Sequence, residues 1–273
     1  NSHCGQIIAD DQMPLRAELF SADQMEQHGK NLAGLHHTFN KLNTHNQLLT
    51  RLNENEQIIL KTYTLLTLVV KSKVRISPAG EWLFDNFYLI EEQIRTAKLH
   101  FPKSYSRELP CLAEGPSAKL PRVYDLALEI ISHGDGRVDT ETLNRFVLAY
   151  QSITPLMLGE LWAIPIMLRL ALIENLRRIS TGITTARLHS AQAQEWAKQM
   201  MKTAECDPKN LILVIADMAR SNPPMTSSFI AELARHLQGH GKALALPLTW
   251  IEQQLAELNL TIEQMVQSET QRQ

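Results

Sequence analysis

Apolar residues recur along this chain at steps of three and four positions, the spacing that places side chains on one face of an α-helix. The clearest run lies in residues 78–100, where the apolar positions are Leu83, Phe87, Ile90, Ile94 and Ala97. Alternating β-branched runs of strand length are absent from the sequence, and its most strand-like segment, residues 211–215, continues into helix-forming residues. The pattern predicts an all-α fold, a multi-helix bundle of about ten to eleven helices.

Residues with known capping chemistry mark where the predicted helices begin. Residues 21–24 and 261–264 fit the capping box, in which a hydroxyl and an amide side chain satisfy two backbone N–H groups. Ser77, Thr154 and Asp207 each precede a proline, which is tolerated at the first helical position. These signals predict helices over residues 22–40, 44–71, 78–100, 121–133, 140–152, 155–180, 185–205, 208–220, 227–238, 246–258 and 262–271.

One segment interrupts the helical pattern. Residues 101–120 contain Pro102, Pro110, Gly115 and Pro116, so we expect a long loop there. An ordered crossover between distant helices is the favoured interpretation, and a functional loop is the alternative.

The composition of the chain argues against some classes of protein. The 273 residues carry 27 Lys and Arg against 29 Asp and Glu, so the chain lacks the positive excess that nucleic-acid binding uses. Three widely spaced cysteines, Cys4, Cys111 and Cys206, favour a reducing compartment. The apolar stretch 153–173 is long enough to cross a bilayer, but it contains charges and two prolines. We interpret it as a buried core helix and expect no membrane span.

Familiar ligand motifs are absent or incomplete in the sequence. Neither a dinucleotide fingerprint nor a P-loop occurs. Residues 135–139 resemble half of a calcium loop that lacks its other acidic ligands, so we expect a turn with Asp139 as a helix cap. His236 and His240 have two-histidine spacing but no glutamate between them, and residues 36–37 and His45 are interpreted as surface histidines. We expect no metal and no cofactor in this chain.

Two carboxylates lie among apolar neighbours, Asp85 and Glu160. Buried acids need partners, and Arg107, Arg122 and Arg169 are available, so structural ion pairs are favoured. The alternative is an acid with a raised pKa, or an acceptor for a sugar hydroxyl. The four tryptophans can also be interpreted in two ways. Packing in the core is favoured, and stacking on sugar rings is the alternative, for Trp82, Trp162, Trp196 and Trp250.

Several long blocks of sequence then point to a family. They are residues 81–94, residues 107–124 with their Arg-Glu-Leu-Pro and Pro-Arg-Val-Tyr motifs, residues 159–165, and residues 169–176. Together they resemble the N-terminal region of cyclic β-1,2-glucan synthases, most densely from about residue 78 to residue 178. The chain accordingly divides into an N-terminal helical extension (1–76), a family-like helical core (77–180) and a C-terminal helical segment (181–273).

The resemblance implies a large bacterial inner-membrane enzyme that polymerises glucose from UDP-glucose and cyclises the product. This chain would be its N-terminal part on the cytoplasmic side, with the downstream transferase and membrane domains as partners and β-1,2-glucan as a candidate ligand. The metal and acceptor motifs of such transferases do not occur here, so we expect a non-catalytic supporting module. One alternative is an α-helical enzyme that uses two carboxylates such as Asp85 and Glu160 as acid and base on a β-glucan. A general protein-interaction scaffold is a further alternative. The residues predicted for a functional surface are Asp85, Arg107, Arg122, Tyr124, Glu160 and Trp162.

Overall fold

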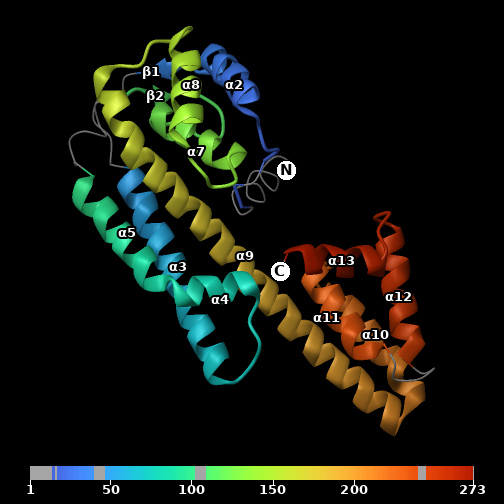
Figure 1. Ribbon diagram of the computed structural model, residues 1–273. Helices are drawn as coiled ribbons and strands as arrows, with labels where there is room; N and C mark the ends of the chain where they lie inside the picture. Colours follow the sequence, from blue (N-terminus) through green and yellow to red (C-terminus); the bar gives the residue numbers. More distant parts are fainter. Residues whose placement is uncertain (1–13, 16, 40–46, 102–108, 239–243, 273) are drawn as a thin grey trace. The chain divides into compact units, whose positions relative to one another are not determined.

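The computed structural model describes residues 14–15, 17–39, 47–101, 109–238 and 244–272. These residues form eleven α-helices and a single pair of two-residue strands, which confirms the all-α prediction (Figure 1). Predictions that concern Cys4, His45, Arg107 and His240 lie outside the described residues.

The chain divides into two compact units. The first contains residues 1–76 and 80–182, and the second contains residues 77–79 and 183–273. The three-part division expected from the sequence stays a prediction.

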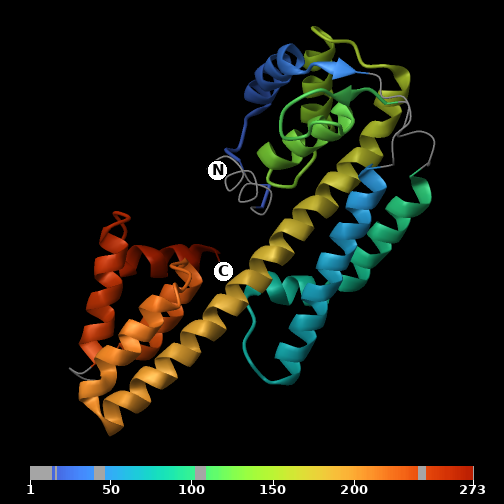
Figure 2. The same ribbon diagram turned by 180° about the vertical axis from the view of Figure 1, so that it is seen from behind.

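The first unit holds most of the helices. They are α2 (Ala22–Leu35), α3 (Gln47–Lys71), most of α4 (Pro78–Asp85), α5 (Phe87–His100), α7 (Arg122–His133), α8 (Thr140–Gln151) and the first part of α9 (Leu158–Cys206). The helix α3 lies between α5 and α9, whereas α2, α7 and α8 form a separate group beside the start of α9 (Figures 1 and 2). Both groups contribute to the buried core of the unit, which includes Ile59, Ile94, Tyr124, Phe146 and Met167.

The described part of the long loop is an ordered crossover. Its strand β2 (Cys111–Leu112) pairs antiparallel with β1 (Thr38–Phe39), which the sequence did not predict. The Leu112 N–H donates to Leu120 O at 3.0 Å, and the Lys119 N–H donates to Leu112 O at 2.8 Å. These bonds close the loop on itself just before α7, and the Ala113 N–H, which donates to His37 O at 2.8 Å, ties the loop to the residues after α2.

The second unit is a helical cluster around its own core. It contains the later part of α9, a short 3₁₀ turn (Pro208–Asn210), α10 (Leu211–Arg220), α11 (Ser227–Leu237), α12 (Ala245–Ala256) and α13 (Ile262–Arg272). Buried residues from these helices include Met200, Met218, Phe229, Leu233 and Ile251. Trp196 and Trp250 pack against this core, as the sequence predicted for them.

Local signals located the helix starts better than the helix lengths. The capping boxes at Ser21 and Thr261 are present, and Asp139 caps α8 by accepting from the Thr142 N–H at 2.8 Å. The break expected after residue 180 was wrong, because α9 continues through it. There the Ser180 and Thr181 hydroxyls donate to carbonyls four residues earlier, which keeps these polar residues inside the helix.

Two other predicted helices are shorter than expected. The helix over residues 78–100 is divided at Asn86, whose side-chain amide donates to Trp82 O at 2.8 Å and competes with the backbone ladder. The helix from residue 22 ends at Leu35, because the following residues pair with the crossover strand instead.

Helices α2 and α8 approach closely at Gly29. A Cβ at this position would lie 2.9 Å from the Phe146 carbonyl oxygen and 3.2 Å from Cδ2 of the Phe146 ring. We expect Gly29→Ala to destabilise the protein by about 1–3 kcal/mol, because the backbones must separate. Gly34→Ala on the same helix is the matched control, since a Cβ there meets nothing within 4 Å. It should stabilise by roughly 0.5–1 kcal/mol in urea unfolding, and equal effects of the two variants would contradict the close approach.

Among the described residues, no helix combines the length and the apolar character needed to cross a bilayer. The stretch 153–173 is a core helix only in part. Its later residues, including Ala163, Met167 and Ile173, are buried, but Ile153 and Leu158 are more than half exposed. The prediction of a fully buried helix was therefore wrong for the first turns of α9.

Candidate functional site

Glu160 is fully buried and bound to Arg122, as the interpretation of this acid as part of a structural ion pair required. The Arg122 Nε donates to Glu160 Oε1 and its Nη2 donates to Glu160 Oε2, both at 2.6 Å. Arg122 also donates to Pro155 O at 2.9 Å, and Glu160 Oε2 accepts from the Met157 N–H at 2.9 Å. The carboxylate therefore joins α7 to the N-terminus of α9 and satisfies one of the N–H groups there.

The hydrogen bonds that Arg122 donates to Glu160 raise the pKa of Arg122, so the guanidinium stays charged. The Arg122 guanidinium carbon also lies 5.9 Å from the centre of the Tyr150 ring, within range of a cation–π interaction. A buried acid already held by two charge-assisted bonds cannot serve as a general acid toward a sugar. The acid–base pair considered from the sequence is therefore not assembled at Glu160.

A chain of polar groups extends from this pair to the end of α2. His36 lies 3.0 Å from the Tyr150 hydroxyl through Nδ1 and 3.2 Å from Asp125 Oδ2 through Nε2. Only 7% of the His36 side chain is exposed, so the interpretation of His36 as a surface residue was wrong. Burial raises the pKa of Tyr150, which keeps its hydroxyl neutral and able to donate. These bonds connect α2, α7 and α8 internally.

The remaining predicted site residues are dispersed. Tyr124 is buried, and burial raises the pKa of its hydroxyl. Asp85 is exposed at the end of α4, so its expected apolar surroundings are not found. Trp162 is 72% exposed and Trp82 is 53% exposed, which makes the core interpretation of both wrong. Because three of the five described candidates are buried, the set does not form one surface, and a functional role for them stays a prediction.

The sequence reasoning missed a highly charged buried site among the described residues, which surrounds Glu174 on α9. Its carboxylate accepts from Arg51 at 3.0 and 3.1 Å, from Arg177 at 2.8 Å, from Arg178 at 3.1 Å and from Asn55 at 2.9 Å. Burial by itself raises the pKa of Glu174, but the arginine bonds and charges outweigh it and lower the pKa to about 2. Arg177 and Arg178 lie three and four positions after Glu174, a spacing from which the sequence could have predicted these pairs.

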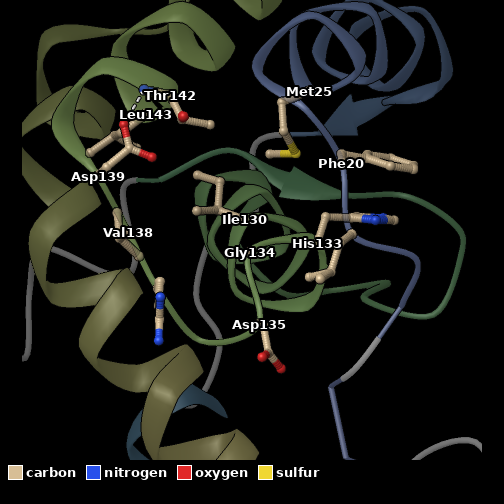
Figure 3. Close-up of a pocket in the computed structure, with 12 residues that line it drawn as sticks. Phe20, Met25, Ile130, His133, Gly134, Asp135, Val138, Asp139, Thr142 and Leu143 are labelled. Atoms are coloured by element: carbon tan, nitrogen blue, oxygen red, sulfur yellow. Dashed lines mark hydrogen bonds between the residues drawn. The ribbon is translucent and has the colours of Figure 1, made fainter.

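A hollow of about 400 Å³ lies between the segment before α2, the end of α7 and the start of α8 (Figure 3). Its lining includes Phe20, Met25, His133, Asp139 and Leu143. The hollow mixes apolar and polar groups, but Asp139 already caps α8 and His133 Nδ1 already contacts Glu18 O at 2.7 Å. These two polar groups are thus bonded within the protein and give no indication of a particular organic ligand.

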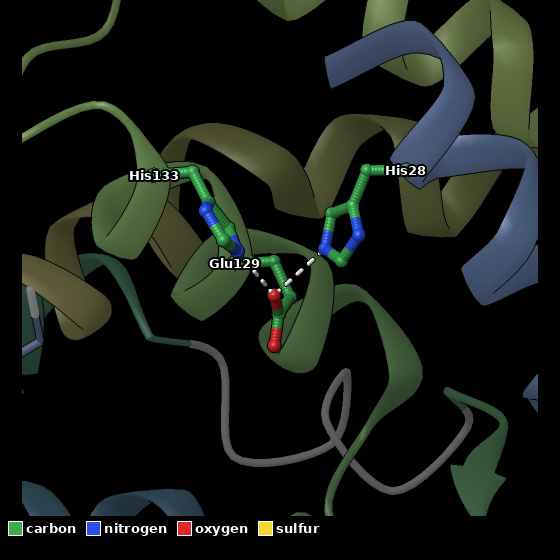
Figure 4. Close-up of side chains that lie close together, drawn as sticks. All are labelled: His28, Glu129 and His133. Carbon is green, nitrogen blue, oxygen red and sulfur yellow. Dashed lines mark hydrogen bonds and ion pairs between the residues drawn. The ribbon is translucent and has the colours of Figure 1, made fainter. Parts of the chain in front are cut away.

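Beside this hollow, His28, Glu129 and His133 converge (Figure 4). His28 comes from α2, whereas Glu129 and His133 are one turn apart on α7. Glu129 Oε2 lies 2.8 Å from His28 Nε2 and 3.4 Å from His133 Nε2. Within the described residues, these are the side chains whose donor atoms are suitably placed to hold a metal ion. The i, i+4 pair was readable from the sequence, but the third residue, from another helix, was not.

These observations define an all-α module of two helical units in which the deeply buried acids are paired with arginines. The module is related to a short segment of a much larger enzyme. It is 31% identical over 222 residues to Cyclic beta-(1,2)-glucan synthase NdvB of Rhizobium meliloti (strain 1021). The aligned part is 81% of this chain but only 8% of that protein, and no protein-family profile matches the chain. The resemblance inferred from the sequence is confirmed.

Proposed function

We propose that this chain is a non-catalytic helical module of a cyclic β-1,2-glucan synthase. It supports the membrane-bound glucosyltransferase that uses UDP-glucose, or positions the growing glucan, on the cytoplasmic side of the bacterial inner membrane. Two facts are consistent with this: the relative is about twelve times longer than the aligned segment, and Glu160 is occupied by Arg122. The activity itself then belongs to other parts of the polypeptide.

The observation that carries the proposal is a group of exposed apolar residues between positions 153 and 162, just before and within the start of α9, which we call the apolar patch: Ile153, Met157, Leu158 and Trp162. Their exposed fractions are 53%, 50%, 61% and 72%. Leu158 and Trp162 are one helical turn apart and therefore share a face of α9. Exposed apolar groups of this kind mark surfaces that another protein segment covers. The rest of the synthase is the occupant that the length of the relative suggests.

Binding to the rest of a cyclic glucan synthase tests this surface. The purified chain should bind the separately produced remainder of the enzyme in detergent, measured by interferometry. Trp162→Ser should weaken the complex by about thirtyfold, the loss expected for an interface hot spot of about 2 kcal/mol. Tyr88→Ser on α5 is the matched control, because this aromatic residue is 71% exposed and lies outside the patch. Equal losses, or no binding at all, would contradict the supporting role.

The alternatives give different results in two further assays. The isolated chain should release no UDP from UDP-glucose, and measurable release would show a catalytic role. Calorimetric titration with linear β-1,2-glucan, repeated on Trp162→Ala, separates chain positioning from support alone. Binding that depends on Trp162 indicates positioning. If neither the remainder of the synthase nor the sugar binds, a general interaction scaffold is the better account of the patch.

A further inference from the structure

We propose that His28, Glu129 and His133 form a binding site for a divalent transition-metal ion, with zinc as the best-fitting member of that class. The proposal departs from the expectation, drawn from the sequence, that this chain holds no metal. It uses residues of the first unit alone and does not depend on the proposed role in glucan synthesis.

The distances between the donor atoms suit a small cation. One ligand atom from each residue lies within 4.8 Å of the other two, and the two nitrogen–oxygen distances are 2.8 and 3.4 Å. Ligands at about 2.0–2.1 Å from a tetrahedral zinc ion stand roughly 3.3 Å from one another. Small side-chain rotations would therefore bring all three atoms to coordination distance without moving either helix.

The hydrogen bond that His133 makes through Nδ1 leaves its Nε2 as the nitrogen available to a metal ion. Its Nδ1 lies 2.7 Å from the Glu18 carbonyl oxygen, which can only accept, so Nδ1 carries the proton. In the neutral imidazole, Nε2 then directs its lone pair toward Glu129 Oε2. A carbonyl that orients a histidine from behind is also the usual outer shell of metal ligands.

The surroundings hold the ligands while leaving space for a further one. Backbone bonds from Ala17 N to Ser132 O and from Phe20 N to His133 O fix the chain before α2 along the end of α7. The Phe20 ring stacks on the His133 ring at 3.8 Å between centres. The exposed fractions of the His28, Glu129 and His133 side chains are 22%, 30% and 11%. The site is thus partly sheltered but reachable, and water can complete the coordination.

The chemistry of the ligands selects the class of metal. Two imidazole nitrogens and one carboxylate oxygen favour zinc and its neighbours, whereas calcium and magnesium prefer sites made of oxygen ligands. Three protein ligands with an open position are typical of zinc sites that keep a bound water.

Titration of the full, untagged chain with zinc chloride tests the proposal. After treatment with a chelator and dialysis under reducing conditions, we expect one zinc ion to bind per chain by calorimetry, and thermal unfolding to shift upward with added zinc. Cobalt should give the visible absorption of a coordinated ion, whereas calcium and magnesium should not bind at the same concentration.

Variants assign the ligands. His28→Asn and Glu129→Gln should each weaken zinc binding by more than the roughly 10–100-fold that loss of an outer-shell partner causes. His37→Ala is the matched control, because His37 also faces a glutamate, Glu114 at 3.9 Å, but is 71% exposed. Cys206→Ser controls for zinc on an exposed thiol. Circular dichroism checks that each variant is folded. Absence of zinc binding by the native chain, or equal binding by His28→Asn and the native chain, would overturn the proposal.

Discussion

Glu174→Gln is expected to destabilise the protein by about 3–5 kcal/mol, because it leaves three arginines around a buried position without their carboxylate. Urea unfolding followed by circular dichroism measures the loss. Glu195→Gln is a suitable control, since Glu195 is an exposed glutamate on the same helix. If the two variants have similar stability, the carboxylate does not hold the cluster together.

The same residue predicts a dependence of stability on pH. Hydrogen bonds and charges from the arginines lower the pKa of Glu174 to about 2 in the folded protein, from its ordinary value of 4.5. A group with a lowered folded pKa stabilises the protein above its unfolded pKa, and this contribution is lost as the pH falls through the folded value. We therefore expect a few kcal/mol to disappear between about pH 4.5 and pH 2. The Glu174→Gln variant should lose less stability than the native chain over this interval, and identical pH profiles would contradict the assignment.

Arg122→Met is expected to cost a similar amount, about 3–5 kcal/mol, because it leaves the fully buried Glu160 carboxylate without its cation. The double variant Arg122→Met with Glu160→Met should be more stable than Arg122→Met alone, since the uncompensated charge is then removed. Urea unfolding of the native chain, both single variants and the double variant gives the coupling between the two residues.

Arg145→Met is the control for the loss of an arginine at the surface. Arg145 pairs with Asp23 and Glu26, but all three side chains are at least one third exposed, so solvent screens the interaction. A loss at Arg145 as large as that at Arg122 would show that burial does not determine the effect.

The sequence predicted the kind of interaction at Glu160 but not its partner. Its apolar neighbours indicated a buried acid, and Arg107, Arg122 and Arg169 were equally available along the chain. The choice of Arg122 depended on the crossover, where its N–H donates to Pro110 O at 3.0 Å, while its side chain bonds Pro155 O and Glu160 at the start of α9. The Arg122–Glu160 pair joins residues that are distant in sequence, and the periodicity of apolar positions contains no information about such pairs.

The exposed tryptophans show a related limit. Trp82 and Trp162 lie in strongly apolar segments, and hydrophobic composition by itself indicates the core. Composition does not say which face of a helix another element covers. The faces that carry these two residues remain exposed in this chain, so the prediction of core burial failed at both of them.

By itself, the sequence determined the helical class of the protein, most helix starts and the relationship to cyclic glucan synthases. These properties depend on local spacing, capping and residue identity, which are written along the chain. Only the tertiary structure decided which charges meet, which aromatic residues stay exposed and that His28 joins Glu129 and His133. The physical reason is that these contacts depend on how helices far apart in sequence pack together, and many packings satisfy the same apolar pattern.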